Sequence, residues 1–138
     1  MYNMTPSDLI GQIMRRDVQT VAPSDPLKYA LEKMLSKDIG NVVAVENEVP
    51  VGVVTERDIL RKVAKGEDVS KLLVRDIMSS PVVTVTPKNN GIEALEIMHR
   101  KNIRRLPVVD EDRLVGIVTQ KDLVYWVLRV AYAPYPPQ

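Results

Sequence analysis

The sequence predicts an α+β protein built from two repeats, each arranged as strand, helix, strand, strand, helix. Three observations predict this class: an internal repeat at a fixed offset, apolar residues at helical or strand spacing, and short polar turns between apolar runs. A repeat of roughly 60 residues buries too little apolar surface to be comfortably stable alone. We therefore expect the two repeats to pack through three-stranded sheets with pseudo-two-fold symmetry.

The internal repeat has an offset of 64 residues without a gap, from Ile13 to Ile77. Residues 13–60 and 77–124 share 18 identities in 48 positions, whereas composition alone would give roughly three. We place repeat 1 at residues 7–65, a charged linker at 66–72, repeat 2 at 73–130 and a proline-containing tail at 131–138.

The first repeat begins with a short β-rich run at residues 18–21. Ser24 or Asp25 is expected to cap the helix that follows, with Pro26 in its first turn. Apolar residues at helical spacing then form one stripe that faces a core. They are Leu27, Ala30, Leu31, Met34 and Leu35.

A hairpin and a second helix complete the repeat. The apolar runs 42–45 and 51–54 flank the polar residues 46–48, a connection short enough only for antiparallel strands. Thr55 opens the second helix, and Gly66 stops it. The second repeat copies this order. Its expected elements are strands at 82–85, 106–109 and 114–118, a turn at 110–113, a helix capped near Asn89 or Asn90, and a helix from Thr119 to about Val130.

Composition excludes several function classes. The chain has 19 Lys+Arg against 18 Asp+Glu, a formal net charge of +1, so no bulk field attracts nucleic acid or a membrane surface. It has no Cys and one His, which excludes disulfides, thiolate nucleophiles and multi-histidine metal sites. No apolar stretch approaches the roughly 18 residues of a membrane span, and no secretion signal is evident, so we expect a cytoplasmic protein.

The most informative motif is a glycine, two β-branched residues, Thr, two polar residues and Asp, found at 52–58 and again at 116–122. One interpretation is a capping box, in which Thr and Asp only terminate the helix. The other is a ligand site: a carboxylate at a helix N-terminus can accept both hydroxyls of a ribose, and nearby N–H groups can hold phosphate. The doubling of the motif favours a ligand site, with the glycine leaving room for the ligand.

Two adjacent arginines, Arg104 and Arg105, lead into a strand of the second repeat. They are either a solvated pair or a phosphate contact, because Arg forms paired hydrogen bonds to phosphate oxygens. The corresponding residues of the first repeat are Gly40 and Asn41, so the two halves are not equivalent. We expect them to bind phosphate unequally.

Together these motifs resemble a tandem pair of cystathionine-β-synthase (CBS) domains over residues 7–130. The resemblance is carried by Ile-Met before each first strand, Thr-Val-x-Pro, Ala-Leu-x-x-Met, Arg-Leu-Pro-Val-Val-Asp in the second repeat, and the two Gly-h-h-Thr-x-x-Asp turns, where h is apolar. It implies two clefts between the repeats that bind adenosine-containing ligands.

The resemblance also implies roles for individual residues. Asp58 and Asp122 would bind ribose hydroxyls. The expected phosphate contacts are Thr55, Arg57, Arg104, Arg105, Thr119 and Lys121. The pockets of the family are crossed, so Asp122 would face 16–18 and 39–40, while Asp58 would face 80–82 and 103–104. The expected adenine slot is therefore Arg16, Asp17, Val18, Ile39, Gly40, Ser80, Pro81, Val82 and Ile103.

The function that follows is a stand-alone regulatory module for energy or metabolite sensing. Its expected ligand is AMP, with ADP, ATP or S-adenosylmethionine as alternatives, and it would act on an unidentified partner protein. The resemblance implies a homodimer, head-to-head or head-to-tail. A ligand-free dimerisation or interaction domain is the second hypothesis. An enzyme is not expected, since the chain offers no base–nucleophile pair and no carboxylate cluster for a metal.

Two further groups of residues are expected to serve packing. Met14, Met34, Met78 and Met98 recur on apolar faces, which favours a core over a metal site. His99 is expected to have a surface or structural role. The C-terminal aromatics are expected to pack against another protomer or against helices of the same domain. They are Tyr125, Trp126, Tyr132 and Tyr135.

Overall fold

The computed structural model describes residues 7–134, 136 and 137, and it confirms the α+β class. The chain divides into two compact units whose limits differ from those of the sequence repeats. Unit 2 is Val18–Val82, and unit 1 joins Met1–Asp17 to Val83–Gln138. Each unit thus combines the helices and paired strands of one repeat with the segment that precedes the first strand of the other repeat.

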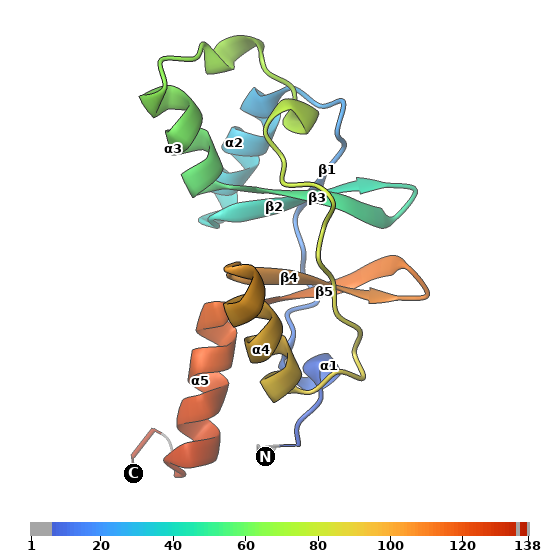
Figure 1. Ribbon diagram of the computed structural model, residues 1–138, viewed down its shortest axis with the longest axis vertical. Helices are drawn as coiled ribbons and strands as arrows, with labels where there is room; N and C mark the ends of the chain where they lie inside the picture. The colour runs from blue at the N-terminus through green and yellow to red at the C-terminus, as the bar shows by residue number, and fades with distance from the viewer. Residues whose placement is uncertain (1–6, 135, 138) are drawn as a thin grey trace. The chain divides into compact units, whose positions relative to one another are not determined.

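Unit 2 contains a three-stranded sheet whose helices lie on one face (Figure 1). β1 (Thr20–Val21) pairs in parallel with β2 (Asn41–Glu46), and β2 pairs antiparallel with β3 (Val49–Thr55). The helices are α2 (Leu27–Lys37) and α3 (Glu56–Ala64). The buried core lies between the sheet and the helices and is entirely aliphatic. Its members include Leu27, Ala30, Met34, Val42, Ala44, Val54 and Ile59.

The N-terminus of α2 is not capped as expected. Pro26 occupies the N-cap, and neither Ser24 nor Asp25 caps the helix. The Asp25 carboxylate instead accepts a hydrogen bond from the Ala22 amide (2.8 Å) in the turn before the helix. At the other end Asp38 adopts the left-handed conformation (φ 52°) that commonly terminates helices. The expected stop after α3 is confirmed, since Gly66 has a φ of 79°.

Both hairpins close through two-residue turns, shorter than the turns expected at 46–48 and 110–113. Asn47 (φ 51°) and Glu48 (φ 68°) are both left-handed, and so are Glu111 (φ 51°) and Asp112 (φ 67°). Two consecutive left-handed residues are the signature of a type I′ turn, whose twist matches that of paired strands.

The segment expected to be a charged linker forms part of unit 2. It contains the short 3₁₀ helix η1 (Val69–Lys71), and a second one, η2 (Val74–Asp76), follows. The Ser70 hydroxyl and amide donate to Asp68 and lower the pKa of this exposed carboxylate. The Leu72 carbonyl accepts a hydrogen bond from the Leu27 amide (2.9 Å), which ties the segment to the start of α2.

Unit 1 repeats this plan with a two-stranded sheet (Figure 1). Strands β4 (Arg105–Asp110) and β5 (Arg113–Thr119) are antiparallel, and the helices are α1 (Ile10–Ile13), α4 (Gly91–Lys101) and α5 (Gln120–Ala131). The expected cap at Asn90 is confirmed, because its side chain accepts from the Glu93 amide at 2.9 Å. None of the helices in the described part of the chain has the length and apolar character needed to span a membrane.

The strand expected at 82–85 is reduced to a single bridge, Val85 with Val108. In unit 2 the Val43 amide donates to the Gln19 carbonyl (3.1 Å), which helps to hold the edge strand β1 on the sheet. The residue that corresponds to Val43 in the second repeat is Pro107, which has no N–H to donate. The prediction of a second three-stranded sheet was therefore wrong, and the proline accounts for the difference.

The cores of the two units are filled differently at one position. In unit 2, Leu27 at the start of α2 is fully buried, whereas the corresponding residue of α4 is Gly91. The ring of Trp126, 1% exposed, fills this space: a Cβ on Gly91 would lie 2.7 Å from two of its ring carbons. The Trp126 indole donates to the buried Asp8 carboxylate at 3.0 Å. Trp126 thus packs in its own unit, while Tyr125 and Tyr132 are exposed and Tyr135 lies outside the described residues.

We predict that Gly91→Ala lowers the free energy of unfolding by about 1–3 kcal/mol, although alanine is the better helix former, because the new methyl group overlaps the Trp126 ring. Urea denaturation followed by circular dichroism measures the change. The same substitution in a Trp126→Leu background should have little additional effect. An equal loss of stability in both backgrounds would contradict the proposed overlap.

Candidate functional site

The two Thr-x-x-Asp turns each lie beside a segment brought in from the other half of the sequence. In unit 1 the Arg15 amide donates to the Ile117 carbonyl, and the Ile117 amide donates to the Arg15 carbonyl, both at 2.9 Å. In unit 2, Ser79 and Val53 form the equivalent pair at 2.9 and 3.3 Å. Ile117 and Val53 precede the threonine of each turn by two residues, so these bridges fix the segment next to the turn.

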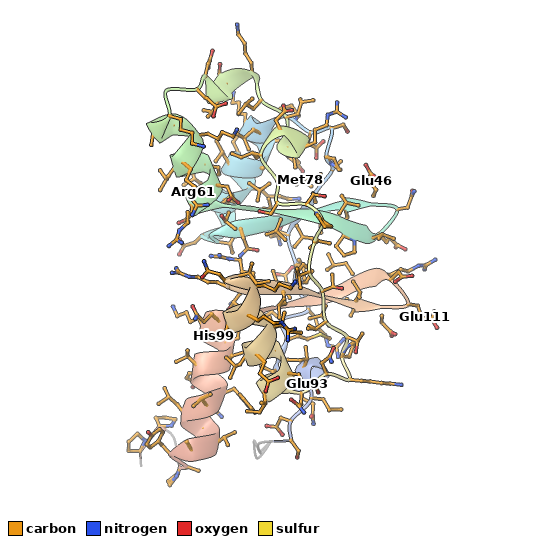
Figure 2. The ribbon with its side chains drawn as sticks, in the orientation of Figure 1. Glu46, Arg61, Met78, Glu93, His99 and Glu111 are labelled. Atoms are coloured by element: carbon orange, nitrogen blue, oxygen red, sulfur yellow. The ribbon has the colours of Figure 1, made fainter. Side chains whose placement is uncertain are left out.

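The glycine of each motif makes room for a methionine of that segment and not for a ligand, so the expectation for these glycines was wrong. A Cβ on Gly52 would lie 2.7 Å from the Met78 sulfur, and one on Gly116 would lie 2.6 Å from the Met14 sulfur. Figure 2 shows Met78 at the surface of the unit 2 sheet. Both methionines are half-buried and pack against the hydrophobic cores, and Met34 and Met98 are buried within them. This confirms the packing role of all four methionines.

The Asp58 turn is a complete capping box. The Asp58 amide donates to the Thr55 hydroxyl (3.3 Å), and the Thr55 amide and hydroxyl both donate to Asp58 Oδ2, at 3.0 and 2.8 Å. Among the described residues these are the only hydrogen bonds of the Asp58 side chain. Oδ1 therefore carries the accepting capacity that the cap does not use, at the positive end of α3.

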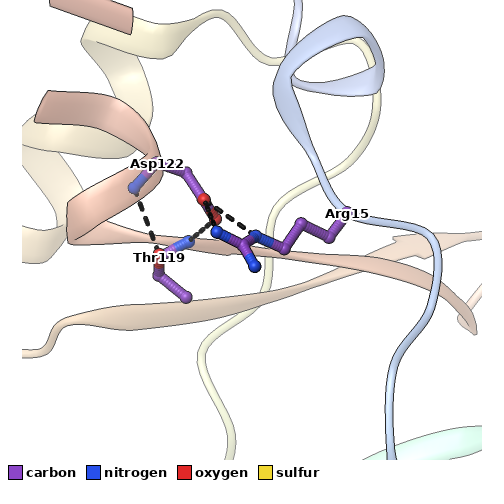
Figure 3. A network of polar contacts seen from close by, with 3 residues as sticks. All are labelled: Arg15, Thr119 and Asp122. Carbon is purple, nitrogen blue, oxygen red and sulfur yellow. Dashed lines mark hydrogen bonds and ion pairs between the residues drawn. The ribbon is translucent and has the colours of Figure 1, made fainter. Parts of the chain in front are cut away.

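The Asp122 turn has both amide bonds of this box, without the bond from the threonine hydroxyl to the carboxylate, and it adds an ion pair (Figure 3). The Asp122 amide donates to the Thr119 hydroxyl (3.2 Å), and the Thr119 amide donates to Asp122 Oδ2 (3.0 Å). The Arg15 guanidinium then binds Oδ1 through Nε and through a terminal nitrogen, both at 2.9 Å. The Asp122 side chain is 9% exposed and that of Arg15 is 65% exposed, so the pair forms the outer edge of the turn.

The loops that enter β2 and β4 contact the same turns within each unit. The Glu56 amide donates to the Gly40 carbonyl (3.1 Å), and the Gln120 amide donates to the Arg104 carbonyl (2.8 Å). These bonds place Gly40 beside the start of α3 and Arg104 beside the start of α5. The backbone at each turn is therefore held from two sides, by the incoming segment and by this loop.

A hollow of about 410 Å³ lies next to the second of these loops, at the end of α4 and the start of α5. His99, labelled in Figure 2, is exposed and lines it, together with Ile103 and Arg104 from the loop. The remaining lining residues are Leu95, Met98, Asn102 and Gln120. Two of the residues expected to contact adenine or phosphate thus border an open volume in unit 1.

The expected site residues divide between the units. Unit 2 holds Val18, Ile39, Gly40, Thr55, Arg57, Asp58, Ser80, Pro81 and Val82. Unit 1 holds Arg16, Asp17, Ile103, Arg104, Arg105, Thr119, Lys121 and Asp122. The structure therefore joins 80–82 to the Asp58 turn through the Ser79 bridge, and Arg16 and Asp17 to the Asp122 turn through the Arg15 bridge. The part of the crossed assignment that joins residues of different units stays a prediction.

Basic side chains around the turns differ in exposure. Arg57 and Lys121 lie exposed in the first turn of α3 and of α5, and Arg104 is exposed on its loop. Arg105 is half-buried at the start of β4. Within the described ranges, no three His, Asp or Glu side chains gather closely enough to hold a metal ion. Each turn therefore offers a carboxylate and a hydroxyl, with basic side chains nearby.

Sequence reasoning missed Arg15. Arg15 lies outside the duplicated motifs, because the residue that corresponds to it in the second repeat is Ser79. A basic residue present in only one copy, directly after the duplicated Ile-Met, was the available signal.

We predict that the caps contribute to stability independently of any ligand. Thr55→Ala and Thr119→Ala each remove the acceptor of an Asp amide and should lower the free energy of unfolding by about 0.5–2 kcal/mol. Thr55→Ser and Thr119→Ser keep the hydroxyl and should retain most of that stability. Urea melts of the four variants test this, and serine variants as unstable as the alanine variants would show that the hydroxyl is not the stabilising group.

The family model of the CBS domain matches this chain twice, over residues 10–65 and 74–129. Among curated proteins, the uncharacterized protein MK0525 of Methanopyrus kandleri is 42% identical over 118 residues. Inosine-5′-monophosphate dehydrogenase of Thermoplasma acidophilum is 40% identical over 114 residues, and the CBS domain-containing protein YhcV of Bacillus subtilis is 38% identical over 115. The matches cover 83%, 81% and 83% of this chain, but 60%, 22% and 81% of those proteins.

Solved structures of similar proteins agree with the fold. A putative signal-transduction protein with CBS domains from Burkholderia ambifaria has a TM-score of 0.82 at 30% identity, covering 94% of this chain and 99% of the other. The CBS domain protein PAE2072 from Pyrobaculum aerophilum, complexed with AMP, has a TM-score of 0.80 at 28% identity, covering 91% and 99%.

The CBS domain pair of protein MJ0100, in complex with 5′-methylthioadenosine and S-adenosyl-L-methionine, has a TM-score of 0.79 at 26% identity and covers 87% of this chain and 95% of that one. The two family-model matches together span more than half of the sequence. The duplicated motifs, the fold of each unit and these similarities lead to one assignment: the chain belongs to the CBS domain family, as a tandem pair.

Proposed function

We propose that this chain binds an adenosine nucleotide, with AMP as the preferred ligand, at the Asp58 and Asp122 turns, and that binding regulates a partner protein. The observation that carries the proposal is the doubled turn itself. In each copy the cap engages Oδ2 of the aspartate, and Oδ1 points away from the cap. A carboxylate oxygen at the positive end of a helix is suited to accept hydrogen bonds from a ribose diol.

The similar structures support the ligand class. PAE2072 is complexed with AMP, and the pair from MJ0100 is complexed with two adenosine derivatives, both of them without phosphate. The ligands in both structures contain adenosine, and both turns of this chain contain an aspartate that is suited to bind its ribose. Basic residues around the turns favour a phosphorylated ligand for this chain, since Arg and Lys form charge-assisted hydrogen bonds with phosphate.

The other expected residues take roles by position. Thr55 and Thr119, with Arg57, Lys121, Arg104 and Arg105, would contact phosphate. The backbone of the segments 16–18, 39–40, 80–82 and the loop residue Ile103 would contact adenine. The hollow at Ile103 and Arg104 offers volume for such a group in unit 1.

Regulation would act through assembly or through a partner in trans, as in an energy or metabolite sensor. Helices α3 and α5 carry exposed apolar residues at equivalent positions, which favours a homodimer formed through helices. Leu60 and Val63 on α3 are 66% and 52% exposed, and Val124 and Val127 on α5 are 53% and 37% exposed.

A second candidate function is a dimerisation or interaction domain without a ligand. The completeness of both capping boxes favours it, because each Thr and Asp already has a structural role. The exposed apolar pairs on α3 and α5 would then be the functional surface. Ligand binding separates the two candidates.

Isothermal titration calorimetry of the purified protein, after confirmed nucleotide removal, should detect AMP binding, with ADP, ATP and S-adenosylmethionine as comparison ligands. AMP should bind more tightly than S-adenosylmethionine, because only AMP offers phosphate to the basic residues. No heat with any of the four ligands would leave the interaction domain as the function.

Asp58→Asn and Asp122→Asn test the ribose assignment without removing the cap, since an amide oxygen can still accept from the threonine amide. Each should weaken AMP binding at its own site by about tenfold or more, because a hydrogen bond to a charged group contributes about 1.5–3 kcal/mol. Asp110→Asn, at the exposed end of β4, is the matched control. Unchanged affinity in both site variants would refute the role of the aspartates.

A further inference from the structure

Both turns form a capping box, and they differ in the side chain that contacts Oδ1 of the aspartate. Asp122 Oδ1 is bound by two nitrogens of Arg15 at 2.9 Å, whereas the described part of the chain offers Asp58 Oδ1 no such partner. The position that corresponds to Arg15 in unit 2 is Ser79, whose side chain is too short and carries no charge. The ligand-accepting oxygen is therefore occupied in one unit and open in the other.

The difference lies in the residue type and not in the backbone. Arg15 and Ser79 form equivalent two-way backbone bridges, to Ile117 and to Val53. Both positions therefore lie at the same place relative to the following threonine. An arginine at either position can reach the aspartate three residues beyond that threonine, and only unit 1 has one.

At the Asp122 turn both carboxylate oxygens have partners, Oδ2 with the Thr119 amide and Oδ1 with Arg15. A ribose diol that binds this carboxylate must displace the guanidinium from Oδ1. An uncharged nucleoside has no anionic group that could replace the carboxylate as the partner of the guanidinium. A nucleotide has such a group, because its 5′-phosphate lies within one arginine side-chain length of the diol and can accept paired hydrogen bonds from the Arg15 guanidinium.

We propose that Arg15 is a specificity-determining residue of the Asp122 site, which makes this site prefer nucleosides that carry phosphate over those that do not. This inference rests on the proposed function and adds selectivity to it. The Asp58 site, without an arginine at position 79, accepts adenosine compounds with or without phosphate. The side chain of Arg15 is 65% exposed, so it is free to swing from the carboxylate to a phosphate without disturbing the core.

The size of the effect follows from two contributions. An exposed ion pair strengthens an interaction by about 1.5-fold to fivefold, which is the factor by which Arg15 would weaken adenosine binding. A charge-assisted contact to phosphate strengthens binding by about tenfold or more. The ion pair must be broken for adenosine and for AMP alike, so its contribution cancels in the ratio of the adenosine Kd to the AMP Kd. The phosphate contact remains, and removal of Arg15 should therefore lower this ratio by about tenfold or more.

The test is an NMR titration of ¹⁵N-labelled full-length protein with adenosine and with AMP. The amides of Thr119 and Thr55 report the two sites separately in one sample. In the wild-type protein the Kd ratio at Thr119 should exceed that at Thr55. Arg15→Ser should lower the ratio at Thr119 by about tenfold or more, and Ser79→Arg should raise the ratio at Thr55.

Two further variants test whether the effect depends on the position and on the geometry of the arginine. Arg100→Ser removes an exposed arginine from α4 and should leave both ratios unchanged. Arg15→Lys keeps the charge but not the paired geometry and should restore part of the ratio. A ratio at Thr119 that Arg15→Ser leaves unchanged, with AMP still bound, would overturn the role of Arg15 alone. Absence of any AMP-dependent shift at either amide of the wild-type protein would overturn this role together with the proposed function.

Discussion

The organisation of this protein depends on two backbone bridges, Arg15 with Ile117 and Ser79 with Val53. Each bridge lays a segment from one half of the sequence along the last strand of a sheet built by the other half. The methionine just before the bridge then packs over a glycine in that strand, where no side chain would fit. The segment is thereby fixed two residues from the turn that carries Thr and Asp, so a single structural device builds both the core and the candidate site.

Much of the fold could be predicted because it depends on local chemistry that the repeat displays twice. The hairpins and the cap at Asn90 follow from short-range patterns, and the structure confirms them. The missing third strand of unit 1 could not be found by matching the repeats, because it depends on a hydrogen bond that one residue, Pro107, cannot donate. For Trp126 the sequence left open packing against another protomer or against helices of the same domain, and the structure shows the second, in a space that Gly91 leaves where the first repeat has a leucine.

The same contrast applies to the candidate site. Shared residues identified Asp58 and Asp122 and the threonines that orient them, and the structure shows both pairs in capping boxes. The role of the motif glycines was assigned wrongly, because a small residue in a strand can make room for a neighbouring side chain as well as for a ligand. Arg15 was missed because it lies outside the duplicated motifs and its contact with Asp122 joins residues that are 107 positions apart in the sequence.

With a net charge of +1, the protein must recognise an anion through local basic groups, and in unit 1 one such group, Arg15, forms an ion pair with Asp122. The most direct test of the central claim is a crystal structure of the protein grown with AMP. We predict ribose hydroxyls within hydrogen-bond distance of the Asp58 or Asp122 carboxylate. AMP bound elsewhere, with both carboxylates contacting only their caps and Arg15, would contradict the account.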